Sequence, residues 1–325
     1  MPGQTNRVLN FNLDIPFSLS DTPADIATAR EKHFRWAADM KLTCDRATEK
    51  KYKSADFPLL VSLVYPWARG EDLDLINDLI GWSFLFNDSL DRPGVRGAIP
   101  KVVAITLDTY REVLNNRPHQ TDEPFLLAWR QILGRLYAKT SEAFYRRHQL
   151  RWEQLFVAFQ READNNAHGI IPTFETYLEL RRAASGVSIC LDWAEAVGNL
   201  ELPSHIHSHH LVQSLRQNTE DVVSMMNDLF SMLGEWNSGN TDNIVIVLAS
   251  QNKWSWDEAT HQICQIINKT VAKFQHTESQ LLSSGFLHSL HPEDRMKTER
   301  CLASMKDWMR GSLDWHYRTA RYKEV

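Results

Sequence analysis

The sequence predicts an all-α protein, and three observations support this class. Only 13 glycines and 12 prolines interrupt the 325 residues. Alternating runs of β-branched residues, which are typical of strands, are scarce. The apolar runs Val61–Val64 and Ile244–Leu248 are short and lie inside helical patterns. We therefore expect a bundle of helices that has a sizeable apolar core, since 43% of the residues are hydrophobic.

The positions of the breaks predict about a dozen helices in one domain. Breaks fall at Arg92-Pro93-Gly94, at Asn116-Arg117-Pro118 and around Ser238-Gly239-Asn240, and none is a long linker. No internal repeat is present, so we expect a single domain over residues 1–325, with residues 1–20 and 318–325 flexible or ordered only on closure of a site. The expected helices cover, in order, Pro23–Leu42, Phe57–Tyr65, Asp72–Phe86, Lys101–Leu114, Glu123–Ala138, Glu142–His168, Ile171–Ser185, Val187–Val197, His209–Glu235, Asn243–Ser250, Ser255–Leu282 and Pro292–Tyr317.

Charge and composition exclude several classes of function. The formal net charge is −5, and acidic and basic residues are mixed along the chain without a basic stripe. This pattern does not predict binding to nucleic acid or to an anionic membrane surface. No basic-then-apolar leader and no long apolar run is present, so we expect no membrane span and a cytoplasmic protein. The cysteines are widely separated and are expected to be reduced thiols, at Cys44, Cys190, Cys264 and Cys301.

Three oxygen-bearing side chains recur at intervals of four within an apolar run. They are Asn227, Ser231 and Glu235. At about 100° per helical residue, they stay within an arc of roughly 80° and share one face. An amide, a hydroxyl and a carboxylate form a hard oxygen ligand set that suits Mg²⁺ together with substrate phosphates. The alternative is a solvated stripe on an amphipathic helix.

A second acidic cluster ends an earlier helix. Asp88 and Asp91 lie on one face at its C-terminal end, after the apolar run that contains Trp82 and Phe84. Carboxylates there meet the negative end of the helix dipole, which is mildly destabilising unless a cation compensates. A bound metal ion would supply that cation. The alternative is an Asp-rich turn.

A basic pair precedes an unusual glycine. Arg181 and Arg182 lie shortly before Gly186, inside an otherwise helical stretch. An interior glycine costs about 1 kcal/mol relative to alanine, so it commonly marks a kink or a close approach. A guanidinium at such a break suits bidentate binding of phosphate oxygens, although a surface arginine pair is the competing explanation. A further arginine and tyrosine follow each other at Arg321-Tyr322.

Together these motifs resemble the bacterial class I terpene synthases over most of the chain. Members of that family carry an Asp-rich motif at a helix end and a triad of the form Asn-Asp-x-x-Ser-x-x-x-Glu roughly 140 positions later. They also carry a diphosphate-sensing arginine about 46 positions before the triad and an Arg-Tyr pair about 80 positions after it. The matching separations here are 227 − 88 = 139, 227 − 182 = 45 and 321 − 235 = 86.

The resemblance implies the α-helical terpenoid synthase bundle around a deep apolar cavity, and a role for each matching residue. Asn227, Ser231 and Glu235 would bind one Mg²⁺, and Asp88 with Asp91 would bind the others, three ions being expected. Arg182 would sense the diphosphate, Ser185 would be the linker residue, and the carbonyl of Gly186 would face the substrate. Arg321 and Tyr322 would bind diphosphate oxygens on closure. Phe84 and Trp315 are candidates for stabilising a carbocation through their ring faces.

Two positions depart from the family pattern. The first residue of the Asp-rich motif is Asn87, whose amide carbonyl can still bind a metal but brings no charge. Either metal affinity should fall, or the ligand role passes to Asp88 or Asp91. Gly234 stands where a basic residue often precedes the triad glutamate, so one diphosphate contact is missing. Both changes make a weakened or specialised enzyme more plausible.

The expected activity is the Mg²⁺-dependent cyclisation of a linear prenyl diphosphate with release of diphosphate. Farnesyl diphosphate is the first expectation for the substrate and geranylgeranyl diphosphate the next. Two alternatives remain open at this point: chain elongation by a prenyltransferase, and a non-catalytic helical binding protein descended from the family. A homodimer is also compatible with the resemblance.

Overall fold

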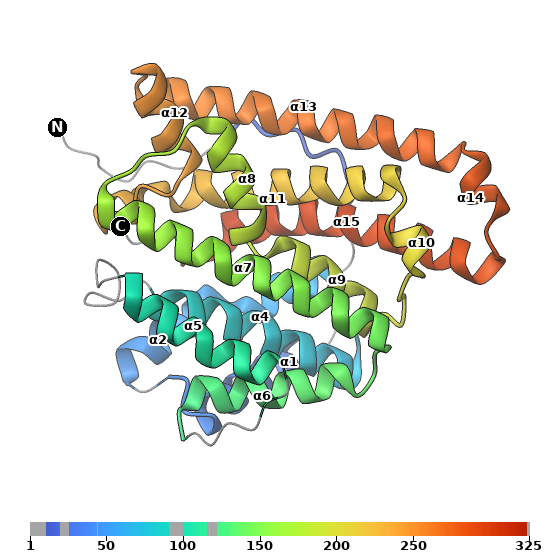
Figure 1. Cartoon of the computed structure of the whole chain (residues 1–325), viewed down its shortest axis with the longest axis horizontal. Coiled ribbons are helices and arrows are strands. Elements are labelled where there is room, and N and C mark those ends of the chain that lie inside the picture. The colour runs from blue at the N-terminus through green and yellow to red at the C-terminus, as the bar shows by residue number, and fades with distance from the viewer. Residues whose placement is uncertain are drawn as a thin grey trace.

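The all-α expectation is confirmed. The computed structural model describes residues 11–19, 26–43, 45–90, 100–115, 117 and 122–323, and its secondary structure in these ranges is helical, without a strand (Figure 1). The helices are α1 (Ile26–Asp39), α2 (Arg46–Ala55), α3 (Phe57–Val64), α4 (Gly70–Leu90), α5 (Pro100–Leu114), α6 (Pro124–Tyr137), α7 (Glu142–His168), α8 (Phe174–Ala184), α9 (Val187–Val197), α10 (Ser204–His207), α11 (His210–Asn237), α12 (Ile244–Asn252), α13 (Trp256–Leu282), α14 (Gly285–Ser289) and α15 (Pro292–Arg318).

Three short helices were not expected from the sequence. Helix α2 is rich in charged residues and has few apolar ones, but the Asp45 side chain caps it by accepting the backbone N–H groups of Ala47 and Thr48. Helices α10 and α14 span only 4 and 5 residues, too few to show a helical period. Helix α4 also runs further than expected, to Leu90, so Asn87 and Asp88 lie in its last turn. The expected break at Arg92-Pro93-Gly94 lies outside the described residues, as does Cys44.

Helix α11 lies at the centre of the bundle. It packs against α13 and α15, and α15 in turn packs against α3 (Figure 1). The contact between α15 and α3 is close because Gly311 has no side chain: a Cβ there would lie 2.5 Å from the carbonyl oxygen of Leu63. The close approach positions the C-terminal half of α15 beside the cavity described below.

The segment 11–19 lies across the central helices. Phe11 packs edge-on against Phe230 of α11, with ring centroids 4.9 Å apart, and Phe17 packs against Phe274 of α13. The backbone N–H of Asp14 donates to the side chain of Asn268 at 2.8 Å. This part of the expected flexible segment 1–20 is therefore held against α11 and α13.

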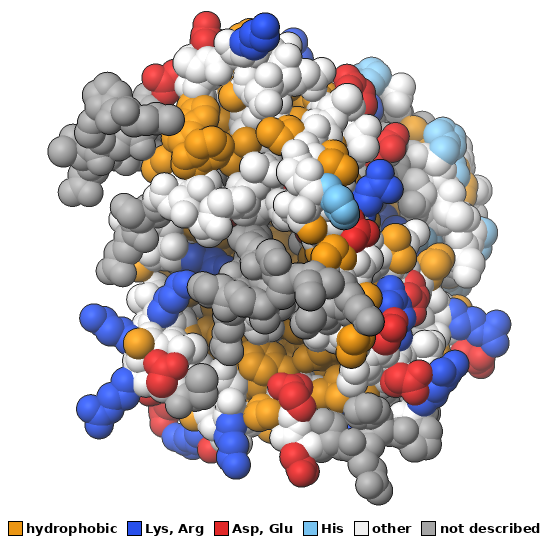
Figure 2. Space-filling model, turned by 60° about the vertical axis from the view of Figure 1, so that its left-hand side comes forward, with side chains coloured by type: hydrophobic (Ala, Val, Ile, Leu, Met, Phe, Trp, Pro, Cys, Tyr) orange, Lys and Arg blue, Asp and Glu red, His pale blue; other side chains and the backbone are white. Residues whose placement is uncertain are grey.

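The surface agrees with the mixed charge of the sequence. Figure 2 shows basic and acidic side chains interspersed on the lower half of one face, with hydrophobic side chains in the recesses. None of the described helices is both long enough and apolar enough to span a membrane.

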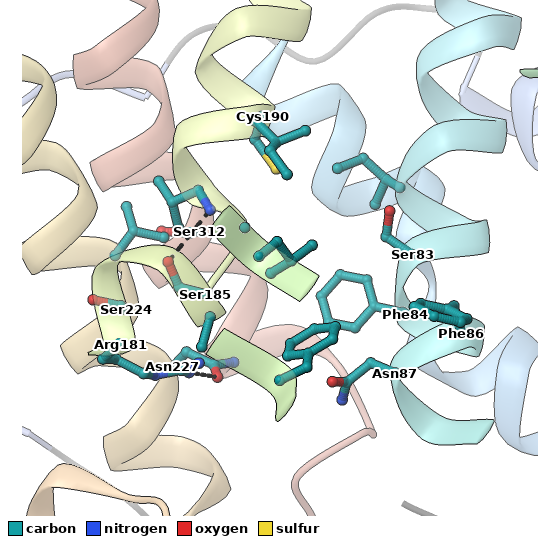
Figure 3. Close-up of a pocket in the computed structure, with 18 of the residues that line it drawn as sticks. Ser83, Phe84, Phe86, Asn87, Arg181, Ser185, Cys190, Ser224, Asn227 and Ser312 are labelled. Atoms are coloured by element: carbon teal, nitrogen blue, oxygen red, sulfur yellow. Dashed lines mark hydrogen bonds between the residues drawn. The ribbon is translucent and has the colours of Figure 1, made fainter. Parts of the chain in front are cut away.

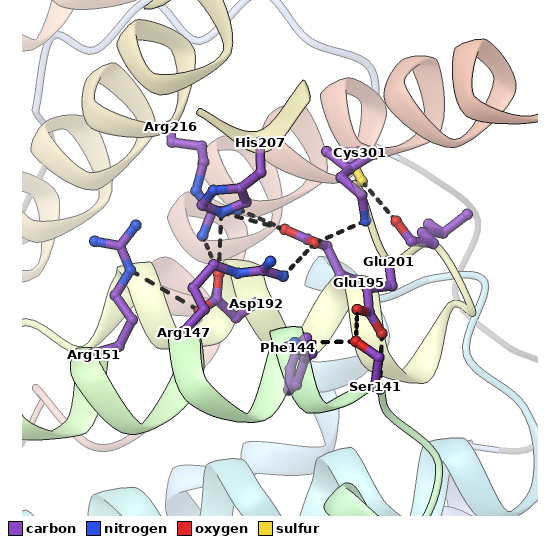
Figure 4. Close-up of polar contacts among 12 residues, drawn as sticks. Ser141, Phe144, Arg147, Arg151, Asp192, Glu195, Glu201, His207, Arg216 and Cys301 are labelled. Atoms are coloured by element: carbon purple, nitrogen blue, oxygen red, sulfur yellow. Dashed lines mark hydrogen bonds and ion pairs between the residues drawn. The ribbon is translucent and has the colours of Figure 1, made fainter. Parts of the chain in front are cut away.

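A buried charge network ties α7, α9, α10 and α11 together (Figure 4). Arg216 of α11 pairs with both Asp192 and Glu195 of α9, and Arg147 of α7 donates to Glu195 at 2.8 Å. His207 lies near both carboxylates, and burial together with Arg216 lowers its pKa to about 3. These two carboxylates and the imidazole are close enough together to hold a metal ion, but Arg216 and Arg147 already supply the positive charge that balances the carboxylates. The network therefore fixes α9 against α11.

Removing the cation at the centre of this network should destabilise the fold strongly. Arg216→Leu leaves two buried carboxylates short of a partner, which costs about 3–5 kcal/mol in comparable buried pairs. We expect a matching loss in the free energy of unfolding measured in urea. Arg295→Leu is the control, because Arg295 pairs with Glu299 at the surface, where both side chains are 44% exposed, and it should cost less than about 1 kcal/mol. Equal losses in the two variants would contradict a structural role for the network.

Candidate active site

A cavity of about 220 Å³ lies between α4, α8, α9, α11 and α15. Its wall combines apolar and aromatic side chains with a large set of polar ones, which face it from opposite sides. Figure 3 shows Asn87 and Phe84 of α4 across from Arg181 of α8 and Asn227 of α11. The lining residues that the argument below uses are Phe84, Asn87, Arg181, Ser185, Gly186, Asn227, Glu235, Trp315 and His316.

The triad expected from the sequence lies on one face of α11. Asn227 and Glu235 line the cavity, and Ser231 stands between them on the same face of the helix. The Oγ of Ser231 is buried and interacts with the carboxylate of Glu235. The two side chains therefore present their oxygens together, as a ligand set for an oxygen-binding cation requires.

Glu235 is buried together with other charges. Burial, and then the neighbouring carboxylate of Asp228, raise the pKa of Glu235 to about 7, although Arg181 opposes this shift. The side-chain amide of Asn243 donates to its Oε2 at 2.9 Å. A divalent cation would compensate the charge that burial disfavours, so the amide, hydroxyl and carboxylate of the triad fit a Mg²⁺ ion by both donor type and electrostatics.

Asp228, which sequence reasoning assigned no role, anchors this part of the site. It is fully buried and accepts hydrogen bonds from the hydroxyl of Tyr177 at 2.6 Å, from Arg181 at 2.9 Å and from the backbone N–H of Ile244 at 3.1 Å. One carboxylate therefore joins α8, α11 and the start of α12. A charged residue directly after Asn227 inside an apolar run was the available signal for it.

Of the two adjacent arginines, the structure places Arg181 in the wall of the cavity. Arg182 points away from the cavity: its guanidinium pairs with Asp221 at 2.7 Å and lines a separate surface groove. Arg181 lines the cavity instead, and its Nη2 donates to the Oδ1 of Asn227 at 2.9 Å. The separations of 46 for Arg181 and 45 for Arg182 both fit a family spacing of about 46, so spacing alone does not distinguish the two.

The helix break lies where the glycine predicted it. Gly186 has a φ of +69° between α8 and α9, a left-handed conformation that glycine adopts without strain. Its carbonyl oxygen accepts the first hydrogen bond of α9, from the N–H of Cys190 at 3.1 Å. The carbonyl of Gly186 is thus engaged in the helix, whereas that of the preceding Ser185 accepts no backbone bond within the described chain. Of the two carbonyl groups, that of Ser185 is therefore the one available to a partner other than the backbone of α9.

The acidic end of α4 is only partly available for a metal. Asn87 lines the cavity, but Asp88 forms a two-pronged ion pair with Arg321, at 2.5 and 3.0 Å. Arg321 compensates the carboxylate at this helix end, which is the task that the sequence assigned to a metal ion. Asp91 lies outside the described residues.

The C-terminal pair and the two aromatic candidates converge on the same place. Arg321 lies over the ring of Phe84, 5.1 Å from its centroid, and the hydroxyl of Tyr322 accepts a hydrogen bond from Asn227 at 2.9 Å. The rings of Phe84 and Trp315 lie 5.7 Å apart, and both side chains line the cavity. Other aromatic side chains complete the wall and were not singled out from the sequence, among them Trp152, Phe159, Trp193 and Trp308.

A group of amide, carboxylate and guanidinium side chains beside aromatic cavity walls defines a class of enzyme that handles an anionic head group and an apolar chain together. The profile of "Terpene synthase family 2, C-terminal metal binding" matches residues 78–273. The chain therefore belongs to terpene synthase family 2, and it is a class I terpene synthase, a lyase that cyclises a prenyl diphosphate.

Similar proteins cover nearly the whole chain. Germacrene A synthase of Nostoc punctiforme is 29% identical over 98% of this chain and 97% of its own length. A synthase of Streptomyces viridochromogenes named 7-epi-alpha-eudesmol synthase ((2E,6E)-farnesyl diphosphate cyclizing) is 25% identical over 95% of this chain and 91% of its own. The crystal structure of germacradien-4-ol synthase from Streptomyces citricolor superposes with a TM-score of 0.84 at 28% identity, covering 94% of this chain and 98% of that one. These likenesses favour cyclisation over the chain-elongation and non-catalytic alternatives.

Matched lysine substitutions test the revised choice of arginine. Arg181→Lys keeps a positive charge beside Asp228 but loses the two-pronged geometry, so it should weaken binding of inorganic diphosphate by at least about tenfold. Arg182→Lys should change this affinity little, because Arg182 faces Asp221 outside the cavity. Isothermal titration calorimetry with diphosphate and Mg²⁺ measures both. A larger loss in Arg182→Lys would restore the original assignment.

Proposed function

We propose that this protein binds farnesyl diphosphate with Mg²⁺, ionises it and cyclises the resulting allylic carbocation. The observation that carries the proposal is the arrangement of the rim and the cavity. Asn227, Glu235 and Arg181 face the space directly above a wall that includes Phe84 and Trp315. A diphosphate at the rim would place its isoprenoid chain among the aromatic rings.

The triad Asn227, Ser231 and Glu235 would hold one Mg²⁺, and Asn87 with Asp91 would serve the remaining ions of the three expected. When bound, these ions supply positive charge that stabilises the departing diphosphate. Asp88 is a weaker candidate while it is paired with Arg321. The neutral amide of Asn87 makes this side of the metal site the weaker one.

The protein's own cations would handle the rest of the diphosphate charge. Arg181 takes the sensing role first given to Arg182, and the carbonyl of Ser185 takes the role first given to Gly186. Arg321 and Tyr322 would complete the contacts, because Tyr322 lies beside Asn227 and Arg321 lies over the ring of Phe84. The N–H and O–H donors of Arg181, Arg321 and Tyr322 bind a developing anion more strongly in a site that excludes water.

The cavity wall would protect the carbocation. Water would quench a cation at once, so the chain must fold in a dry space whose walls attract positive charge without attacking it. The ring faces of Phe84 and Trp315 can contribute about 0.5–2 kcal/mol each by cation–π attraction. The indole N–H of Trp315 donates to the carbonyl of Ala55 at 3.0 Å, which fixes the orientation of its ring.

Two observations favour the C15 substrate over the C20 substrate. The cavity of about 220 Å³ is small compared with the roughly 300–1,000 Å³ of common ligand pockets. One of the similar proteins is named for farnesyl diphosphate. The homodimer and the cytoplasmic location stay predictions from the resemblance.

The direct test is incubation of the purified protein with Mg²⁺ and geranyl, farnesyl or geranylgeranyl diphosphate, followed by gas chromatography. We expect cyclic products from farnesyl diphosphate. Glu235→Gln should abolish turnover and leave the circular dichroism spectrum unchanged, because it removes the charged ligand of the triad. Turnover retained in Glu235→Gln would refute the metal role of the triad.

Restoring a carboxylate at the start of the Asp-rich motif should strengthen metal binding. Asn87→Asp adds a charged oxygen ligand, so the Mg²⁺ concentration for half-maximal turnover should fall by roughly tenfold. Asn240→Asp is a matched control, because Asn240 also lines the cavity but belongs to neither motif. If both variants shifted the Mg²⁺ dependence equally, the effect would come from added charge alone and not from a ligand at position 87.

A further inference from the structure

His316 is a buried cavity residue with no role in the scheme above. It lies on α15, is 5% exposed and stacks on Tyr322 with ring centroids 5.3 Å apart. Its two ring nitrogens have different partners. Nδ1 lies 2.6 Å from the carbonyl oxygen of Ser312, and Nε2 lies 3.4 Å from the Nδ2 of Asn227.

The partner of Nδ1 decides which nitrogen carries the proton. A carbonyl oxygen only accepts, so Nδ1 must be the donor and must carry hydrogen. In a neutral imidazole the other nitrogen is then an acceptor. Nε2 faces the Nδ2 of Asn227, and this NH₂ group only donates while Oδ1 is held by Arg181, so Nε2 is the acceptor nitrogen of a neutral ring. Nε2 therefore presents a lone pair to Asn227.

The amide of Asn227 can be held in two orientations that differ only by exchange of its oxygen and nitrogen. In the observed one, Oδ1 accepts from Arg181 at 2.9 Å and Nδ2 faces His316 and the hydroxyl of Tyr322. In the flipped orientation the NH₂ group of Asn227 would face the guanidinium of Arg181, and its oxygen would face the lone pair on Nε2 of His316. Both contacts would be unfavourable. The hydroxyl of Tyr322 can donate or accept, so it does not distinguish the two.

Arg181 and His316 are thus the two groups that select the orientation, and only one of them keeps this task during the reaction. In the proposed function Arg181 turns its donors to the diphosphate. His316 has no such second partner, because the carbonyl of Ser312 occupies its other nitrogen. Its lone pair stays directed at Asn227.

We propose that His316 is a positioning residue that holds the amide of Asn227 with its oxygen toward the metal site. The proposal rests on the proposed function, in which Asn227 is a metal ligand. His316 touches neither metal nor substrate in this scheme. It acts by fixing which atom of Asn227 is available as a ligand, and loss of such a partner typically lowers metal affinity by about 10–100-fold.

The experiment measures Mn²⁺ binding by electron paramagnetic resonance in the presence of inorganic diphosphate, which requires no turnover. His316→Phe keeps an aromatic ring against Tyr322 but has no acceptor, so Mn²⁺ affinity should fall by about tenfold. His316→Gln can place an amide oxygen near the position of Nε2 and should restore most of the affinity. His316→Met, which also lacks a strong acceptor, replaces the phenylalanine variant if that one does not fold.

A second background separates positioning from packing. In Asn227→Asp the two side-chain oxygens are equivalent, so no orientation remains to be selected. His316→Phe should then lower Mn²⁺ affinity by less than about twofold relative to Asn227→Asp alone. An equal loss in both backgrounds would overturn the proposal, as would unchanged affinity in His316→Phe with the asparagine present.

Asn227→Ala distinguishes failure of this proposal from failure of the proposed function. It should abolish the tight Mn²⁺ binding. If Asn227→Ala binds Mn²⁺ like the original protein, then Asn227 is not a ligand and both proposals fail together. If Asn227→Ala loses binding but His316→Phe does not, the metal site stands and only the positioning role is wrong.

Discussion

The ion pair between Arg181 and Asp228 is the constraint on which the site depends. It joins the end of α8 to the middle of α11, and Asp228 has no exposed surface. A buried charge is tolerated only with close partners, so neither helix can slide without leaving one of them uncompensated. The same guanidinium reaches Asn227. The pair thereby places the helix break and the metal-binding face at a set distance from each other.

Two ion pairs at the mouth are already formed within the protein: Asp88 pairs with Arg321, and Arg181 pairs with Asp228. Binding of a diphosphate with its metal ions would exchange the partners of Asp88 and Arg321, while the Nε of Arg181 stays with the buried Asp228. Such an exchange lowers the electrostatic cost of assembling several cations and an anion above an apolar cavity. Asp88 lies on α4 and Arg321 lies just after the end of α15. The contact between these two segments would therefore depend on whether substrate is bound.

The fold was predictable because helical periodicity and breaks are local signals. The triad was predictable as well, since a spacing of four on a helix fixes the shared face of Asn227 and Glu235. The choice between Arg181 and Arg182 was not, because adjacent helical residues diverge by about 100° and only the packing of α8 shows which one faces inward. The role of His316 depends on its contact with Asn227, 89 positions away in the chain, which no local pattern reports.

Asn87 bears on the stability of the protein as well as on its metal affinity. A cluster of unpaired carboxylates at the mouth would repel one another whenever the ions are absent, and this repulsion would favour unfolding. An amide at position 87 contributes no charge to such a cluster, and Asp88 is paired with Arg321 while the site holds no substrate. The metal-free protein therefore carries less electrostatic strain than a fully acidic motif would impose. With asparagine at position 87, the protein binds metal less tightly but is more stable when no metal is bound. This is a local case of the trade-off between activity and stability.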